Sequence, residues 1–68
     1  MPKMIPVSSS NLAAVGYEGS TLYIRFHTGG FYCYFNVPPS IYEGLMNAPS
    51  HGRFFLVHIK NVYKYQKL

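Results

Sequence analysis

Two neighbouring stretches of the chain alternate between apolar and polar side chains with the period of a β-strand. The apolar positions are Leu22, Ile24 and Phe26 in residues 21–27, and Phe31, Cys33, Phe35 and Val37 in residues 31–37. A period of two is typical of strands that bury one face. Gly29–Gly30 lies between the two stretches and favours a two-residue turn, because both central positions of such a turn need positive φ. The pattern therefore predicts a β-hairpin.

The position of the turn sets the pairing that we expect. With Gly29–Gly30 as the loop, the opposed pairs are Leu22 with Val37, Ile24 with Phe35, and Phe26 with Cys33. The apolar side chains of both strands then share one face, which a slip of one residue would prevent. Residues 12–17 are small and apolar and end at a further turn signal, Glu18–Gly19, which places Val15 opposite Leu22. We therefore expect a three-stranded antiparallel β-meander with one apolar face.

Two short helices are expected after the strands. Proline cannot continue a ladder of hydrogen bonds, so Pro38 and Pro39 end the sheet. Residues 41–48 predict a helix that stops before Pro49, and Ser50 is suited to cap a second helix over about residues 51–61. Strands followed by helices indicate an α+β fold in which both helices pack on one face of the meander.

The length of 68 residues allows one domain only. We expect residues 1–7, which prolines interrupt, to form a flexible N-terminal arm, and residues 8–68 to form the domain. No apolar run approaches the roughly 20 residues of a membrane helix, and the first residues lack the apolar stretch of a secretory signal. A single cysteine, Cys33, forms no internal disulfide. These features indicate a cytoplasmic protein.

Residues that carry catalysis are scarce. The chain has no Asp, and Glu18 and Glu43, its only Glu residues, lie 25 positions apart. A paired-carboxylate mechanism and a Ser-His-Asp triad therefore lack parts. The spacing of the three His residues and Cys33 matches no zinc pattern, and we interpret Cys33 as an inert core residue. We expect no metal or organic cofactor, and a binding protein rather than an enzyme.

The polar positions of the two strands form the opposite face of the expected sheet. They are Tyr23, Arg25, His27, Tyr32, Tyr34 and Asn36. Aromatic rings interleaved with basic groups suit nucleic acid, because every base has a π-face and Arg adds cation–π attraction. Two other interpretations stay open: an interface between copies of the chain, and a solvated surface that cross-strand Tyr–Arg pairs stabilise.

A formal net charge of +4 favours an anionic partner. Arg53 stands at the start of the expected second helix, where it either holds a phosphate or is solvated. Aromatic and basic residues alternate toward the C-terminus, and those that extend the candidate site are Lys60, Tyr63, Lys64 and Tyr65. The lysines are equally consistent with a solvated face, or with phosphate attraction that weakens steeply with salt.

Many short segments resemble the KTSC domain. They are residues 7–17, 22–26, 29–38, 48–55, 58–60 and 63–65, and the most recognisable motif is Tyr-x-Tyr at Tyr32–Cys33–Tyr34. This family takes its name from the C-terminus of some lysyl-tRNA synthetases and also occurs as small stand-alone bacterial or phage-type proteins. The sequence departs from the family pattern at Cys33, Leu56 and Val57, where polar or basic residues are common.

The resemblance implies RNA binding, which the tRNA-synthetase context suggests, and implies no catalytic residues. Together with the aromatic and basic face, it predicts a non-enzymatic module that binds RNA or another nucleic acid. Two alternatives stay open: a homo-oligomer that sequesters a small anionic nucleotide, and a protein–protein interaction domain. The apolar departures at Cys33, Leu56 and Val57 favour contact with an apolar surface, such as another copy of the chain.

Overall fold

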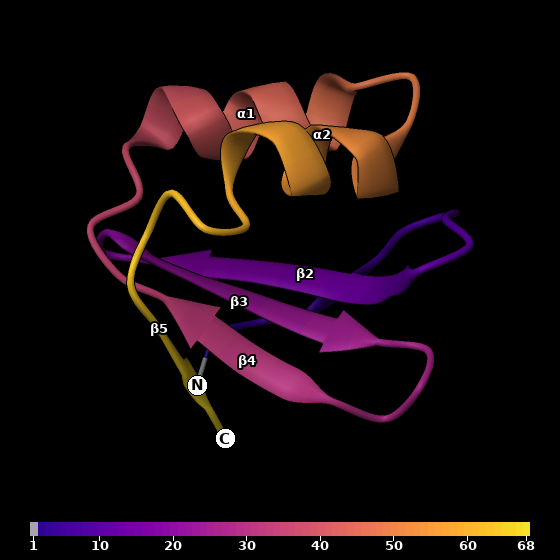
Figure 1. Ribbon diagram of the computed structural model, residues 1–68, viewed down its shortest axis with the longest axis horizontal. Coiled ribbons are helices and arrows are strands. Elements are labelled where there is room, and N and C mark those ends of the chain that lie inside the picture. Colours follow the sequence, from indigo (N-terminus) through magenta and orange to yellow (C-terminus); the bar gives the residue numbers. More distant parts are fainter. Residues whose placement is uncertain (1) are drawn as a thin grey trace.

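A layer of two helices lies across one face of an antiparallel sheet (Figure 1). The computed structural model describes residues 2–68. The elements in chain order are β1 (Ile5–Pro6), β2 (Leu12–Glu18), β3 (Thr21–Phe26), β4 (Phe31–Tyr34), α1 (Pro39–Asn47), α2 (His51–His58) and β5 (Tyr65–Lys67). The five strands lie side by side in the order β1-β2-β3-β4-β5. The α+β class and the central meander of β2, β3 and β4 are confirmed, and the sheet has two more strands than the three we expected.

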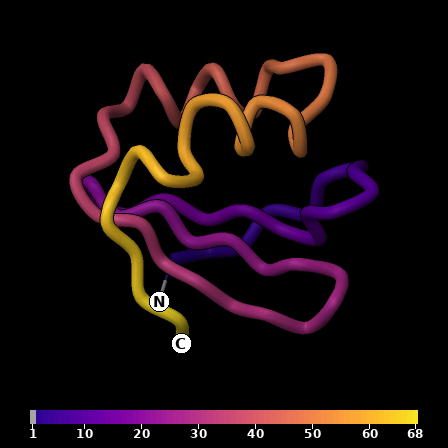
Figure 2. Tube along the Cα trace, viewed as in Figure 1, coloured from indigo at the N-terminus to yellow at the C-terminus, as the bar shows by residue number. Residues whose placement is uncertain are grey.

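Both additional strands are short and lie at the edges of the sheet. β1 pairs with β2 through Ile5 and Pro6, so part of the expected N-terminal arm joins the sheet; Met1 of that arm lies outside the described residues. β5 pairs with β4, and the chain returns from α2 through residues 59–64 to reach it (Figure 2). The aromatic and basic tail is therefore a strand beside the Tyr-x-Tyr motif.

The pairing of β2 with β3 keeps the expected faces. Val15 lies opposite Ile24 rather than Leu22, because the loop is Gly19–Ser20, with Gly19 at a φ of 63°. This shift of two residues leaves Val15 on the same side of the sheet. A bulge between Leu12 and Ala14 then turns Leu12 toward the helices in place of Ala13.

The pairing of β3 with β4 differs from the expected one by three residues. Leu22 lies opposite Tyr34, and Ile24 lies opposite Tyr32. The loop has three residues, 27–29, because Phe26 N–H donates to the carbonyl of Gly30 and only Gly29 takes a positive φ, of 100°. An odd shift exchanges the two faces of a strand. The expected register is therefore wrong, and Tyr32 and Tyr34 point toward the helical layer.

The helices begin and end close to where the sequence predicts. Pro39 occupies the first turn of α1, where its missing N–H costs nothing, and α1 ends at Asn47, before Pro49. The Ser50 hydroxyl accepts a hydrogen bond of 3.2 Å from the Arg53 N–H and so caps α2. α2 ends at His58, three residues earlier than expected. No helix of the described residues is long and apolar enough to cross a membrane.

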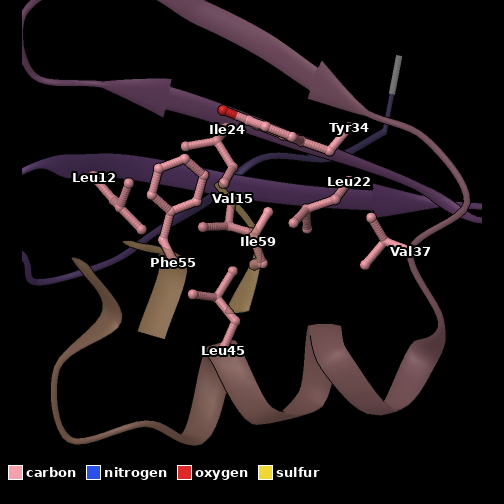
Figure 3. Packing of buried hydrophobic residues seen from close by; sticks show 9 residues of the cluster. All are labelled: Leu12, Val15, Leu22, Ile24, Tyr34, Val37, Leu45, Phe55 and Ile59. Carbon is pink, nitrogen blue, oxygen red and sulfur yellow. The ribbon is translucent and has the colours of Figure 1, made fainter. Parts of the chain in front are cut away.

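The core lies between the helices and the sheet, where apolar side chains from both layers converge (Figure 3). Its members are Leu12, Val15, Leu22, Ile24, Tyr34, Val37, Leu45, Phe55 and Ile59. Phe35, which we expected in this core, is 36% exposed, and Val62 is exposed as well. Tyr34 takes the place of Phe35 beneath the helices as a consequence of the exchanged face of β4.

Candidate functional site

The structure divides the expected aromatic and basic face between the two sides of the sheet. Tyr23 and Arg25 lie on the side away from the helices, where Tyr23 pairs with Cys33 and Arg25 with Phe31. Tyr32 and Tyr34 lie on the helical side. The four side chains therefore form no single surface, because the exchanged face of β4 separates them.

On the side away from the helices, Arg25 already has an aromatic partner. Its guanidinium carbon lies 4.6 Å from the centre of the Phe31 ring, and the Tyr23 ring lies 6.4 Å from that ring. A cation–π contact of this kind stabilises the exposed hairpin. Cys33 is buried in this face, as expected of an inert cysteine, although it points away from the helices.

On the helical side, α2 leaves part of β4 and β5 uncovered, and an open cleft of about 370 Å³ lies there. We call it the aromatic cleft. Its lining residues are Asn11, Phe26, Thr28, Tyr32, Tyr34, Phe55, Leu56, Lys60, Asn61 and Tyr65. A concave site with apolar walls and a few polar groups at its margin is the usual form of a binding site.

Aromatic rings pack against one another along the sheet side of the cleft. The Tyr65 ring centre lies 5.8 Å from that of Tyr32 and 5.7 Å from that of Tyr34. Phe55 of α2 meets Tyr34 edge to face at 5.4 Å. Tyr34 is 5% exposed whereas Tyr65 is 60% exposed, so the cleft grades from a buried floor to an open wall.

The cleft floor is a poor environment for charge on a phenol. Burial, together with the neighbouring phenols of Tyr32 and Tyr65, raises the pKa of Tyr34 from 10.0 to about 12. Tyr34 therefore remains neutral across the physiological range and presents an uncharged ring to the cleft.

The charges at the cleft are positive. Lys60 lines it, and Lys67 shares the helical side of β5 with Tyr65 because side chains alternate along a strand. Neither Glu residue lines it: Glu18 ends β2, and Glu43 lies on α1. The aromatic cleft therefore combines exposed ring surface with attraction for an anion.

A family model for the KTSC domain matches residues 8–63. The chain belongs to the KTSC domain family. A KTSC domain protein from Yersinia pestis has a crystal structure that matches with a TM-score of 0.95 and 36% identity, over 100% of this chain and 99% of the other. The resemblance seen in the sequence is thereby confirmed.

Relatives of this KTSC domain occur in proteins of very different length. A lysine–tRNA ligase from Nostoc punctiforme is 50% identical over 48 residues, which is 71% of this chain and 9% of the ligase. A lysine–tRNA ligase from Nostoc sp. is 39% identical over 67 residues, 96% of this chain and 12% of the ligase. The chain thus spans about a tenth of these ligases. An uncharacterised protein from Stutzerimonas stutzeri is 36% identical over 66 residues, 94% of this chain and 87% of that protein.

The aromatic cleft of this KTSC domain brings together four of the ten predicted site residues: Tyr32, Tyr34, Lys60 and Tyr65. The other six lie elsewhere. His27 sits in the β3–β4 loop, where its Nε2–H donates to the Ser9 carbonyl at 2.9 Å. Arg53 lies with Phe54 and His58 in a second hollow, between α2 and the connection from α1. Tyr63 and Lys64 line a third, with Tyr65 at its end.

His58 does not line the aromatic cleft. It is exposed at the end of α2, and its ring lies 4.4 Å from that of Phe54.

Sequence reasoning missed six residues of the cleft. They are Asn11, Phe26, Thr28, Phe55, Leu56 and Asn61. We expected Phe26 on the apolar face of the sheet, and it packs, partly buried, against the core. Leu56 carried a signal, because an apolar residue stands there against the family pattern, and it is 51% exposed at the cleft.

Proposed function

We propose that this KTSC domain is a non-enzymatic module that binds single-stranded RNA, with bases stacked in the aromatic cleft. The observation that carries the proposal is the combination of the half-open rings of Tyr32 and Tyr65 with Lys60 in one concavity. This differs from the site that the sequence suggested, which was an open sheet face.

Base stacking explains why such rings are left in water. A tyrosine ring that is 60% exposed, as in Tyr65, contributes less to folding than a buried one. Stacking of a base on an aromatic ring contributes about 1–3 kcal/mol and tolerates any base. The ring of Tyr65 is held in position by Tyr32 and Tyr34, so little conformational entropy is lost when a base arrives.

Electrostatics support the same ligand class. Lys60 and Lys67 flank the rings, so the phosphates of a strand whose base occupies the cleft would meet cations. Lysine–tRNA ligases, which are named for an RNA substrate, carry a segment similar to this chain. This relationship favours RNA over DNA as the nucleic acid.

Tyr65→Ala tests the proposal directly, since Tyr65 is exposed and its loss removes stacking area without emptying the core. We expect the affinity for a fluorescently labelled single-stranded RNA, measured by anisotropy, to fall by about tenfold, as the loss of one base–aromatic stack predicts. Tyr23→Ala is the matched control, because Tyr23 is a half-buried tyrosine of the opposite sheet face. Its affinity should remain that of the unsubstituted protein.

Three outcomes distinguish the possibilities. Equal losses for the two variants, or a larger loss for Tyr23→Ala, would place the contact on the other face and reject the cleft. Absence of RNA binding rejects the proposed function. Tight binding of free mononucleotides, with no gain from flanking residues, would assign the aromatic cleft to a small anionic nucleotide instead, which its volume also accommodates.

A further inference from the structure

β5 forms an edge of the sheet and turns part of its backbone away from it. The Leu68 N–H donates to the carbonyl of Phe31, so Leu68 and, by alternation, Gln66 direct their backbone groups toward β4. Tyr65 and Lys67 therefore direct their N–H and C=O groups outward. Among residues 2–68, no hydrogen bond outside the sheet ladder reaches these outward groups. Such an edge can accept a further strand.

The two edges of the sheet differ in how well they are protected. β1, at the other edge, contains Pro6, which has no N–H to offer a further strand. β5 contains no proline, and its three residues are all exposed. Exposed apolar side chains also gather around it, since Val62, Tyr65 and Leu68 are each more than half exposed. The surface near β5 therefore has both unpaired backbone and apolar area.

We infer that β5 pairs antiparallel with β5 of a second copy of the chain, across a twofold axis at Gln66. In this register Tyr65 of each copy lies opposite Lys67 of the other. Because both residues direct their backbone outward, each of these two pairs exchanges both of its hydrogen bonds. The register centred on Gln66 is also the one that pairs all three residues of β5.

The side chains favour a second copy as the partner. Lysine at an edge repels a strand that presents cations to it. In the twofold register Lys67 instead meets the phenol ring of Tyr65, which attracts it by a cation–π contact, and Lys64 lies opposite Leu68. No lysine of residues 64–68 faces another lysine, so this edge is complementary to itself.

The dimer would join the two sheets into one and keep both helical layers on the same side of it. Tyr65 lines the aromatic cleft, and the cleft lies where α2 leaves β4 and β5 uncovered. The twofold axis therefore places the two aromatic clefts side by side.

The experiment measures the mass of the whole chain by sedimentation velocity over a range of protein concentrations. We expect the mass to rise from that of a monomer toward twice that value. Lys67→Pro removes an outward N–H and should remain monomeric over the same range. Slow amide exchange of the Phe35 N–H, which bonds to the carbonyl of Lys64, verifies that β5 stays paired with β4 in this variant.

Two further variants separate the backbone from the side chain. Lys67→Gln is the matched control, because it removes the same charge as Lys67→Pro but keeps the N–H, and it should still dimerise. Tyr65→Lys keeps the whole backbone and places a lysine opposite Lys67 in both pairs. We expect it to weaken the dimer by about tenfold, as two pairs of opposed like charges predict.

Salt provides an independent measurement. Each copy carries a net charge of +4 and residues 62–68 contain no acid, so added salt should strengthen the dimer by screening repulsion. An association that salt weakens would depend on ion pairs elsewhere and would overturn the inference.

Other results overturn it as well. They are a monomeric mass at millimolar concentration, and dimerisation of Lys67→Pro and Tyr65→Lys as strong as that of the unsubstituted protein. Protection of the Tyr65 and Lys67 amides by an added poly-glutamate peptide, in a chain that stays monomeric, would assign the edge to an acidic strand instead. Each of these results leaves the proposed RNA binding untouched.

Discussion

At the scale of single residues, Tyr34 connects the core with the candidate site. Its ring packs against Phe55 and belongs to the core cluster, while it also lines the aromatic cleft. Phenylalanine would fill the same space in the core. The hydroxyl gives this position a property that phenylalanine lacks, because its ionisation is opposed by burial and by two neighbouring phenols.

This property predicts how stability depends on pH. The pKa of Tyr34 is raised in the folded state from 10.0 to about 12, so the folded protein holds this proton more tightly than the unfolded chain does. Its contribution to the free energy of unfolding is fully present below pH 10.0 and is lost as the pH rises toward about 12, at up to about 1.4 kcal/mol per pH unit. Urea unfolding of the protein and of Tyr34→Phe at several alkaline pH values measures it.

The difference between the two proteins isolates Tyr34, because all other titrating groups are shared. We expect the stability of the unsubstituted protein relative to Tyr34→Phe to be constant up to about pH 10 and then to decrease. A constant difference up to about pH 11.5 would contradict the altered pKa.

At the scale of elements, the short strand β5 supplies one wall of the aromatic cleft. It is a fully exposed strand of three residues, and the residues matched by the family model end before it. Yet it carries Tyr65, the open wall of the aromatic cleft, and it pairs with β4 at Tyr32, Cys33 and Tyr34. The geometry of the cleft therefore depends on a short edge strand.

Proline scanning of β5 tests this dependence. The Leu68 N–H donates to the carbonyl of Phe31, and the Phe35 N–H donates to the carbonyl of Lys64. Hydrogen-bonded pairs alternate along an antiparallel ladder, so Gln66 is hydrogen-bonded to Cys33 opposite it. The Lys67 N–H then points away from β4. Gln66→Pro removes a ladder bond and should release β5 and weaken RNA binding about as much as Tyr65→Ala. Lys67→Pro keeps the ladder and should keep β5 paired.

Amide hydrogen exchange of the Phe35 N–H, which bonds to Lys64 beside β5, measures the pairing in both variants. Fast exchange is expected for Gln66→Pro and slow exchange for Lys67→Pro. Equal protection in the two variants would show that the strand is held by its side chains rather than by its backbone.

At the scale of the whole molecule, charge is the property that acts over distance. The chain has six basic and two acidic residues, and the resulting charge of +4 would attract the proposed RNA before any ring is contacted. Of the lysines, Lys60 lines the cleft and Lys67 lies on the helical side of β5, whereas Lys64 precedes β5 and lies opposite Phe35, on the other side of the sheet. Stacking is nearly independent of salt, so the two contributions can be separated.

The salt dependence of RNA affinity should report these contacts. Two phosphate contacts to a single strand predict a slope of about −1.4 in a plot of log K against log salt, or roughly a sevenfold loss between about 50 and 200 mM. Lys60→Gln should reduce the slope by about 0.7, whereas Lys3→Gln, on the N-terminal arm, should not. Affinity that is unchanged by salt would contradict phosphate contact at the cleft.

Local signals in the sequence were sufficient for the helices and for the central strands. Pro39, Pro49 and Ser50 mark helix ends through backbone chemistry that acts within a few residues. The face of β3 was predicted correctly, because Leu22 and Ile24 alternate with polar residues and only one face is apolar.

The face of β4 was not decided by such a pattern. Its two faces carry Phe31 and Cys33 on one side and Tyr32 and Tyr34 on the other. A tyrosine has a large apolar ring with a polar end, so it occurs both in cores and at surfaces. Alternation therefore allowed both orientations. A three-residue loop that places only Gly29 at positive φ, together with the contact of Phe55 with Tyr34, selects the observed one.

The sequence by itself determined the α+β class, the places of the two helices and the inward face of β3, because each depends on neighbours along the chain. Only the tertiary structure decided that β1 and β5 flank the meander and that Tyr32, Tyr34, Lys60 and Tyr65 share a cleft. These features depend on loop geometry and on contacts between residues far apart in the chain, where an odd shift of one strand moves every side chain to the opposite face.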